Sequence, residues 1–189
     1  KDILAMNFSI TRFLFGYDFF ISYSRADANS YALRLTEYLI SNGYSCYIDK
    51  WGSEPGKKLP ANLKRNVSNA LILILLGSNA SLQSEAMNEE VEIFVHTKRM
   101  LIPVDFGAIH TAIWWPKIEG LALTNERIEV LSNDSDICEE LKLRIKGSFK
   151  YSKQSKRIKN FLIGGVCITL TLIIVSIIFS INIKDLNKK

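Results

Sequence analysis

The hydrophobic pattern of the first third of the chain alternates between short apolar runs and a stretch of helical periodicity. Residues 17–23 are mainly aromatic and aliphatic, and they predict a strand. Apolar residues then recur at helical spacing, namely Ala28, Ala32, Leu35 and Leu39. Residues 24–27 supply side-chain acceptors at the start of this helix, Gly43 ends it, and residues 44–49 predict a second strand.

The same alternation continues along the chain. The further predicted elements are helices over residues 59–67, from about 83 to 99 and from 135 onward, and strands over residues 70–76, 100–105 and 121–123. The proline of the fourth strand, Pro103, places that strand near an edge of the sheet. Strands that alternate with helices predict an α/β fold, here a flavodoxin-like parallel sheet of about five strands with helices on both faces.

Ligands of such sheets gather at the carboxyl ends of the strands. Five polar or aromatic residues are expected at that edge, namely Ser24, Arg25, Asp49, Lys50 and Trp51. This edge is therefore where we look for a functional site.

A long apolar run divides the chain. Residues 161–183 carry no ionisable group except the thiol of Cys167, and a bilayer core requires about 20 such residues. We therefore expect a single membrane span rather than a buried core helix. The predicted organisation is an N-terminal extension (1–16), one domain (17–149), a basic linker (150–160), the transmembrane helix (161–183) and a short tail (184–189).

The charges are distributed unevenly around this predicted span. Residues 1–141 hold 13 Lys and Arg against 18 Asp and Glu, whereas residues 142–189 hold 11 basic residues against one acidic residue. The excess of basic residues before the span predicts a cytoplasmic domain at the cell membrane, with the linker against anionic lipid. A nucleic-acid partner is not expected, because the domain itself is acidic. The cysteines and histidines have no metal-ligand spacing, so no metal is expected either.

One glutamate of the third predicted helix differs from its neighbours. On a helical wheel Met87, Val91, Phe94 and Val95 form the buried stripe, and Glu85, Glu89 and Glu92 project to the opposite side. Glu90 instead lies at the rim of the apolar face, where partial desolvation would make its charge more effective toward a bound cation. The alternative is a rim glutamate in a surface ion pair.

Several of these segments together resemble a known family. Residues 17–25 resemble the first signature box of Toll/interleukin-1 receptor (TIR) domains, and residues 84–91 resemble the serine-to-glutamate segment of the NAD⁺-cleaving members. The later elements match in order and spacing, and the resemblance covers roughly residues 17–149. Membrane-tethered bacterial TIR proteins are the most similar kind.

The resemblance implies an activity and a set of site residues. It implies that NAD⁺ is a substrate rather than a cofactor, and that it is hydrolysed or cyclised with release of nicotinamide in antiviral defence or cell-death signalling. Glu90 matches the catalytic position. The residues implied to bind substrate are Tyr23, Arg25, Trp51, Glu54, Gly56, Lys57 and Ser84. One departure is Ala86, where the family commonly has a tryptophan, and this weakens the expected nucleotide stacking.

Activity in this family is usually switched by assembly with other TIR domains. Confinement to a membrane plane would promote assembly by raising the effective concentration. Small residues along one side of the predicted span permit close helix approach, namely Gly165, Thr169, Ser176 and Ser180. Two other functions stay open: a non-catalytic scaffold that recruits TIR domains at the membrane, and an oligomer whose spans perforate the membrane.

Overall fold

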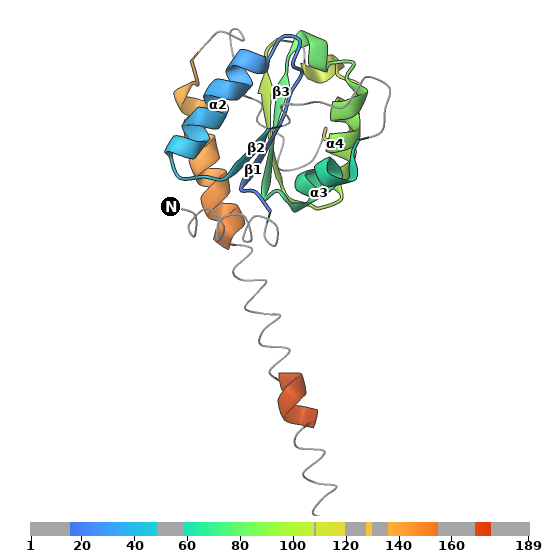
Figure 1. Ribbon diagram of the computed structural model, residues 1–189, viewed down its shortest axis with the longest axis vertical. Coiled ribbons are helices and arrows are strands. Elements are labelled where there is room, and N and C mark those ends of the chain that lie inside the picture. The colour runs from blue at the N-terminus through green and yellow to red at the C-terminus, as the bar shows by residue number, and fades with distance from the viewer. Residues whose placement is uncertain are drawn as a thin grey trace, which may run out of the picture. The chain divides into compact units, whose positions relative to one another are not determined.

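The centre of the computed structural model is a five-stranded parallel sheet with the strand order β2-β1-β3-β4-β5 (Figure 1). The strands are β1 (Phe19–Ser22), β2 (Cys46–Ile48), β3 (Ile72–Gly77), β4 (Met100–Asp105) and β5 (Ile128–Glu129). The structure describes residues 16–48, 59–107, 109–119, 128–129, 136–154 and 169–174. The order of the strands reverses direction between β1 and β3, which is where parallel sheets of this kind bind ligands.

Helices cover both faces of this sheet, as predicted. The helices are α2 (Asn29–Ser41), α3 (Ala61–Asn69), α4 (Glu85–Val95) and the helical residues 139–154. The short 3₁₀ helices are η1 (Asn79–Ser81), η2 (Ile109–Thr111) and η3 (Trp115–Lys117). Figure 1 shows α2 and the orange helix that begins at residue 139 on one face of the sheet, and α3 and α4 on the other.

Successive side chains of each strand point to opposite faces of the sheet, and helices cover both faces. This explains why the strand sequences are almost entirely apolar. Ile72, Ile74 and Leu76 of β3 pack in the core beneath α2, whereas Leu73 and Leu75 pack in the core beneath α3 and α4. A strand buried on both faces needs apolar residues at every position. The same period places Phe20 of β1 on the α4 side.

The pairing of β4 with its two neighbours explains how the sheet accommodates Pro103. Pro103 is paired with Leu75 of β3, whereas the described residues of β5 pair only with Val104 and Asp105. In the sheet order β4 is one strand from the edge, and among the described residues β5 pairs with it only at Val104 and Asp105. The predicted strand over residues 121–123 lies outside the described residues.

Two sequence predictions about helix ends were wrong. Residues 24–27 do not cap α2, because Ala28 is its N-cap residue and the cap has no side-chain hydrogen bond. The third predicted helix, α4, is shorter at both ends than residues 83–99, because Ser84 caps its start and His96 follows its last residue. The Gly43 prediction is confirmed, since Gly43 follows α2 with a φ of 80°, a conformation that favours glycine.

The chain divides into two units, Lys1–Phe149 and Lys150–Lys189. In the second unit, residues 169–174 form a helix whose side chains are exposed. None of the helices in the described parts of the chain has the length and apolar character to cross a membrane. The predicted span 161–183 lies outside the described residues except for 169–174, and Thr169 is the one described member of the small-residue stripe.

Candidate active site

The carboxylate of Glu90 lies at the carboxyl end of β1. Ser22, the last residue of that strand, donates a hydrogen bond from its Oγ to Glu90 Oε2 at 2.5 Å. Glu90 is 6% exposed and Ser22 is 1% exposed. The carboxylate is therefore removed from bulk water and held beside the point where the strand order reverses. This burial contradicts the alternative that Glu90 is a surface residue.

Local sequence explains why α4 presents Glu90 toward the sheet. The Oγ of Ser84 accepts a hydrogen bond from Met87 N at 3.3 Å, which satisfies one amide of the first helical turn. Met87, Val91 and Phe94 then pack into the core beneath α4, as their helical spacing predicts. Glu90 lies three residues after Met87 and four before Phe94, hence close to the same side of the helix, so packing of the stripe brings the carboxylate to β1.

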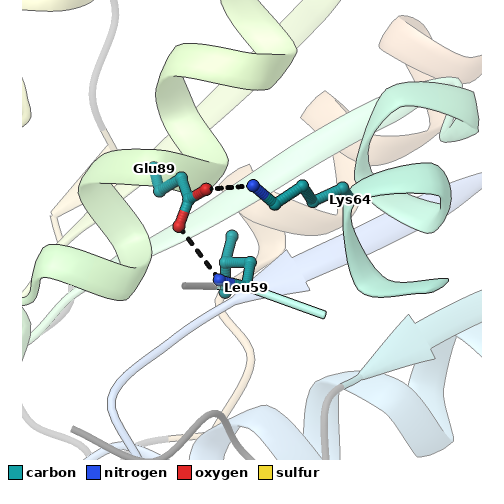
Figure 2. Close-up of polar contacts among 3 residues, drawn as sticks. All are labelled: Leu59, Lys64 and Glu89. Carbon is teal, nitrogen blue, oxygen red and sulfur yellow. Dashed lines mark hydrogen bonds and ion pairs between the residues drawn. The ribbon is translucent and has the colours of Figure 1, made fainter. Parts of the chain in front are cut away.

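The neighbouring residue Glu89 has a different environment (Figure 2). Its Oε1 forms an ion pair with Lys64 Nζ of α3 at 2.6 Å, and its Oε2 accepts a hydrogen bond from Leu59 N at 3.1 Å. Glu89 is therefore only partly exposed, because α3 lies close enough to engage it. The ion-pair partner of Lys64 is thus Glu89, the residue before Glu90 in the sequence.

The remaining glutamates of α4 point outward, as predicted. Glu85 and Glu92 are exposed. Lys117 donates a hydrogen bond to Glu92 Oε2 at 2.8 Å, and this bond together with the positive charge lowers the pKa of Glu92. Val95, which was expected in the buried stripe, is only partly buried against the core. Among the described glutamates of α4, Glu90 is the one classed as buried.

A second pairing of a serine with a carboxylate, which is only partly buried, lies at the same edge of the sheet. Ser78, which follows β3, donates a hydrogen bond to Asp27 Oδ1 at 2.6 Å, and Ala80 N donates to Asp27 Oδ2 at 2.7 Å. Asp27 thus ties the segment before α2 to the turn η1. Asp27 was expected to help cap α2, and this contact explains why it does not.

A third carboxylate, that of Asp105, lies at the carboxyl end of β4. Asp105 is 3% exposed, and its Oδ1 accepts hydrogen bonds from Gly107 N at 2.8 Å and Ile109 N at 3.0 Å. A methyl group at Gly77, the neighbouring residue of β3, would lie 2.6 Å from Ile109 Cγ1, so glycine is needed there. Asp105 therefore shapes the backbone at this edge.

The predicted substrate-binding residues are placed only in part. Arg25 is exposed in the segment after β1, and the hydroxyl of Tyr23 donates to Asn29 Oδ1 at 3.3 Å. Ser84 is the cap of α4, which accounts for its position in the sequence without a ligand. The other predicted residues, Trp51, Glu54, Gly56 and Lys57, lie outside the described residues.

Other candidate groups have structural roles. Trp114 is fully buried and donates from Nε1 to Ser81 O at 3.0 Å, so it is part of the core. Burial raises the pKa of the Cys46 thiol to about 12, so this cysteine stays protonated and is not a thiolate nucleophile. The described residues contain no cluster of three or more His, Cys, Asp or Glu suited to a metal ion.

Ser22 is the site residue that sequence analysis missed. It was part of the resemblance to the first TIR box but was not singled out. A signal was available, because Ser22 lies two residues after Phe20 and therefore on the same face of the strand. A polar residue at that position of an apolar strand needs a hydrogen-bond partner from the elements that cover it.

Comparisons with known proteins gave one family model and several similar solved structures. A family model described as TIR domain matches residues 19–137. The TIR domains in the structure of the activated Roq1 resistosome directly recognizing the pathogen effector XopQ are 18% identical, over 72% of this chain and 83% of that chain, with a TM-score of 0.43. A metazoan TIR-STING receptor from C. gigas is 26% identical, over 57% of this chain and 37% of that chain, with a TM-score of 0.44. No curated protein sequence gave a significant match.

Proposed function

The chain belongs to the TIR-domain family, and from that premise we propose that it cleaves NAD⁺ between nicotinamide and ribose. The observation that supports this most is the buried Glu90 carboxylate at the carboxyl end of β1. A domain that only recruits partners has no need of a desolvated carboxylate at the ligand-binding edge of its sheet.

The chemistry requires one carboxylate. The bond between C1′ of the ribose and the pyridinium nitrogen breaks, and its electron pair leaves with nicotinamide, which departs as a neutral molecule. Because no proton has to be supplied to this leaving group, the second carboxylic acid of ordinary glycosidases is unnecessary. Positive charge develops on the sugar, and the Glu90 carboxylate stabilises it. Attack by water on C1′ then gives ADP-ribose and a proton, and attack by a ring nitrogen of adenine gives a cyclic product.

The surroundings of α4 support the assignment of this role to Glu90 rather than to another glutamate of the helix. Lys64 is paired with Glu89, and Lys117 is paired with Glu92. These two carboxylates are partly or largely exposed, so solvent screens their charges. A carboxylate in a buried setting interacts more strongly with a nearby cation.

The proposal includes attachment to the cell membrane with the TIR domain in the cytoplasm. Its support is the uncharged run of residues 161–183 and the basic residues before it. Confinement to the plane of the bilayer raises the local concentration of copies, which favours TIR–TIR assembly and thereby activity. Arg25 and the loop residues Trp51, Glu54, Gly56 and Lys57 are proposed substrate contacts, as are Tyr23 and Ser84.

The test is consumption of NAD⁺ by the full chain, crowded on lipid vesicles. We expect nicotinamide release by the wild type and a loss on the order of 10²–10³-fold in Glu90→Gln. Glu92→Gln is the matched control, because it removes an exposed charge from the same helix, and its activity should equal that of the wild type. Equal activity in wild type and Glu90→Gln would contradict the proposal.

The other candidate functions are separated by the same preparation. A scaffold would recruit a second TIR domain to the vesicles without consuming NAD⁺ in any variant. A perforating oligomer would release an encapsulated dye, and the release would persist in Glu90→Gln. Either pattern without nicotinamide release would replace the enzymatic proposal.

A further inference from the structure

We propose that Ser22 is a positioning residue, whose hydroxyl orients the Glu90 carboxylate for cleavage of NAD⁺. This inference rests on the proposed function and assigns a role to a residue outside the set expected to bind substrate. Its basis is the 2.5 Å hydrogen bond from Ser22 Oγ to Glu90 Oε2, which joins residues 68 positions apart in the sequence.

The geometry of this bond is typical of a hydroxyl that donates to an ionised carboxylate. Such charge-assisted O–H···O⁻ bonds are short, about 2.5–2.7 Å, and stronger than bonds between neutral groups. Both side chains are buried, so solvent does not compete for them. The charged form of the carboxylate is the one that would stabilise a sugar cation.

The position of Ser22 in the sheet makes it a rigid support. Ser22 is the last residue of β1 and is in register with Leu75 of β3, in the middle of the sheet. Glu90 is carried by a helix whose buried residues pack on the same face of the sheet. The bond therefore connects two fixed elements, and holding Oε2 sets the plane of the carboxylate. Groups supported in this way keep the productive geometry more precisely than groups on loops.

The same edge of the sheet provides a matched comparison. Ser78 is also buried, lies directly after a central strand and also donates to a carboxylate, Asp27 Oδ1, at 2.6 Å. That carboxylate additionally accepts from Ala80 N and so holds the turn after β3. Removal of the Ser78 hydroxyl thus takes away a bond of the same kind that has no part in the proposed chemistry.

The experiment compares Ser22→Ala, Ser22→Thr and Ser78→Ala in the full chain on vesicles. We expect Ser22→Ala to lower kcat on the order of 10²-fold while KM changes less than about twofold, because a misoriented carboxylate loses an interaction specific to the transition state. Ser22→Thr, which keeps the hydroxyl, should recover most of kcat. Ser78→Ala should keep both constants of the wild type although it is less stable.

A second measurement tests the bond without reference to activity. The unfolding free energies of Ser22→Ala, Glu90→Gln and the double variant form a cycle, and a coupling between the two sites is expected from their contact. If Ser22→Ala does not fold, Ser22→Cys replaces it, because the thiol is close in size and is only a weak donor. Ser22→Cys should then show the same loss of kcat.

The outcomes separate this inference from the proposed function. If Glu90→Gln abolishes NAD⁺ cleavage while Ser22→Ala keeps the kcat of the wild type, Ser22 has no positioning role and the enzymatic proposal stands. The same conclusion follows if Ser22→Ala and Ser78→Ala lose kcat equally, or if the cycle gives no coupling. If the wild type cleaves no NAD⁺, both proposals are wrong.

Discussion

Two serine–carboxylate pairs at the same edge of the sheet differ in what they connect. In one, Ser78 and the backbone of Ala80 bond to the two oxygens of Asp27, and all three groups lie outside the strands and the α-helices. In the other, Ser22 at the end of a central strand bonds to Glu90 on a helix. The first arrangement holds a turn in place, whereas the second holds a carboxylate in place.

The comparison shows that serine–carboxylate hydrogen bonds of similar length can have different roles. A carboxylate whose two oxygens are both bonded to one turn is a structural clip, and its loss costs stability. A carboxylate that a rigid strand holds beside the reversal of strand order is suited to act on a ligand. Substitution of Glu90 is accordingly expected to have the largest effect on activity, and substitution of Asp27 the largest effect on stability.

The structural role of Asp27 predicts a large loss of stability without a loss of catalysis. Asp27→Asn replaces the charged carboxylate, whose two oxygens accept hydrogen bonds from Ser78 and Ala80, by a neutral amide with one acceptor oxygen. Hydrogen bonds to charged groups contribute about 1.5–3 kcal/mol each. We expect the free energy of unfolding, measured by chemical denaturation, to fall by about 2 kcal/mol. NAD⁺ cleavage by the folded variant should match that of the wild type. A variant of unchanged stability and reduced kcat would reverse the roles assigned to the two pairs.

The ion pair beside Glu90 predicts a smaller effect. Lys64→Met removes the Lys64–Glu89 pair and keeps an apolar stem of similar length. Both side chains are partly exposed, so a loss of only about 0.5 kcal/mol is expected in the same denaturation experiment. Leu59 N still has its acceptor on Glu89, and kcat should not change. A large fall in kcat would show that the anchoring of α3 to α4 contributes to the chemistry of Glu90.

The pair between Glu92 and Lys117 predicts the smallest effect, visible as a dependence on pH. Because Lys117 lowers the pKa of Glu92 below its ordinary 4.5 in the folded chain, the pair stabilises the fold above that value. The contribution is lost as the pH falls through the lowered pKa. The difference in thermal midpoint between wild type and Lys117→Met should thus be small at pH 7 and vanish in acid. A difference that grows in acid would contradict this sign.

Much of the fold could be predicted from sequence because its signals are local. The apolar run of β3, the helical spacing of Met87, Val91 and Phe94, and the glycine after α2 each report on their own neighbourhood. Glu90 could be placed at the rim of an apolar stripe in the same way. The TIR resemblance added the order of the elements, which the family model supports over residues 19–137.

The contacts between distant segments could not be predicted in this way. Asp27 was expected to cap α2 and instead bonds to the turn after β3, and the pairing of Glu89 with Lys64 of α3 was not predicted. Ser22 lies in an apolar strand, and the residues next to it in the sequence do not indicate that Glu90 is its acceptor. Hydrophobic periodicity establishes which face of an element is buried, since that depends only on the spacing of its residues. Which donor meets which acceptor depends on strand order and helix packing, and these exist only once the sheet has assembled.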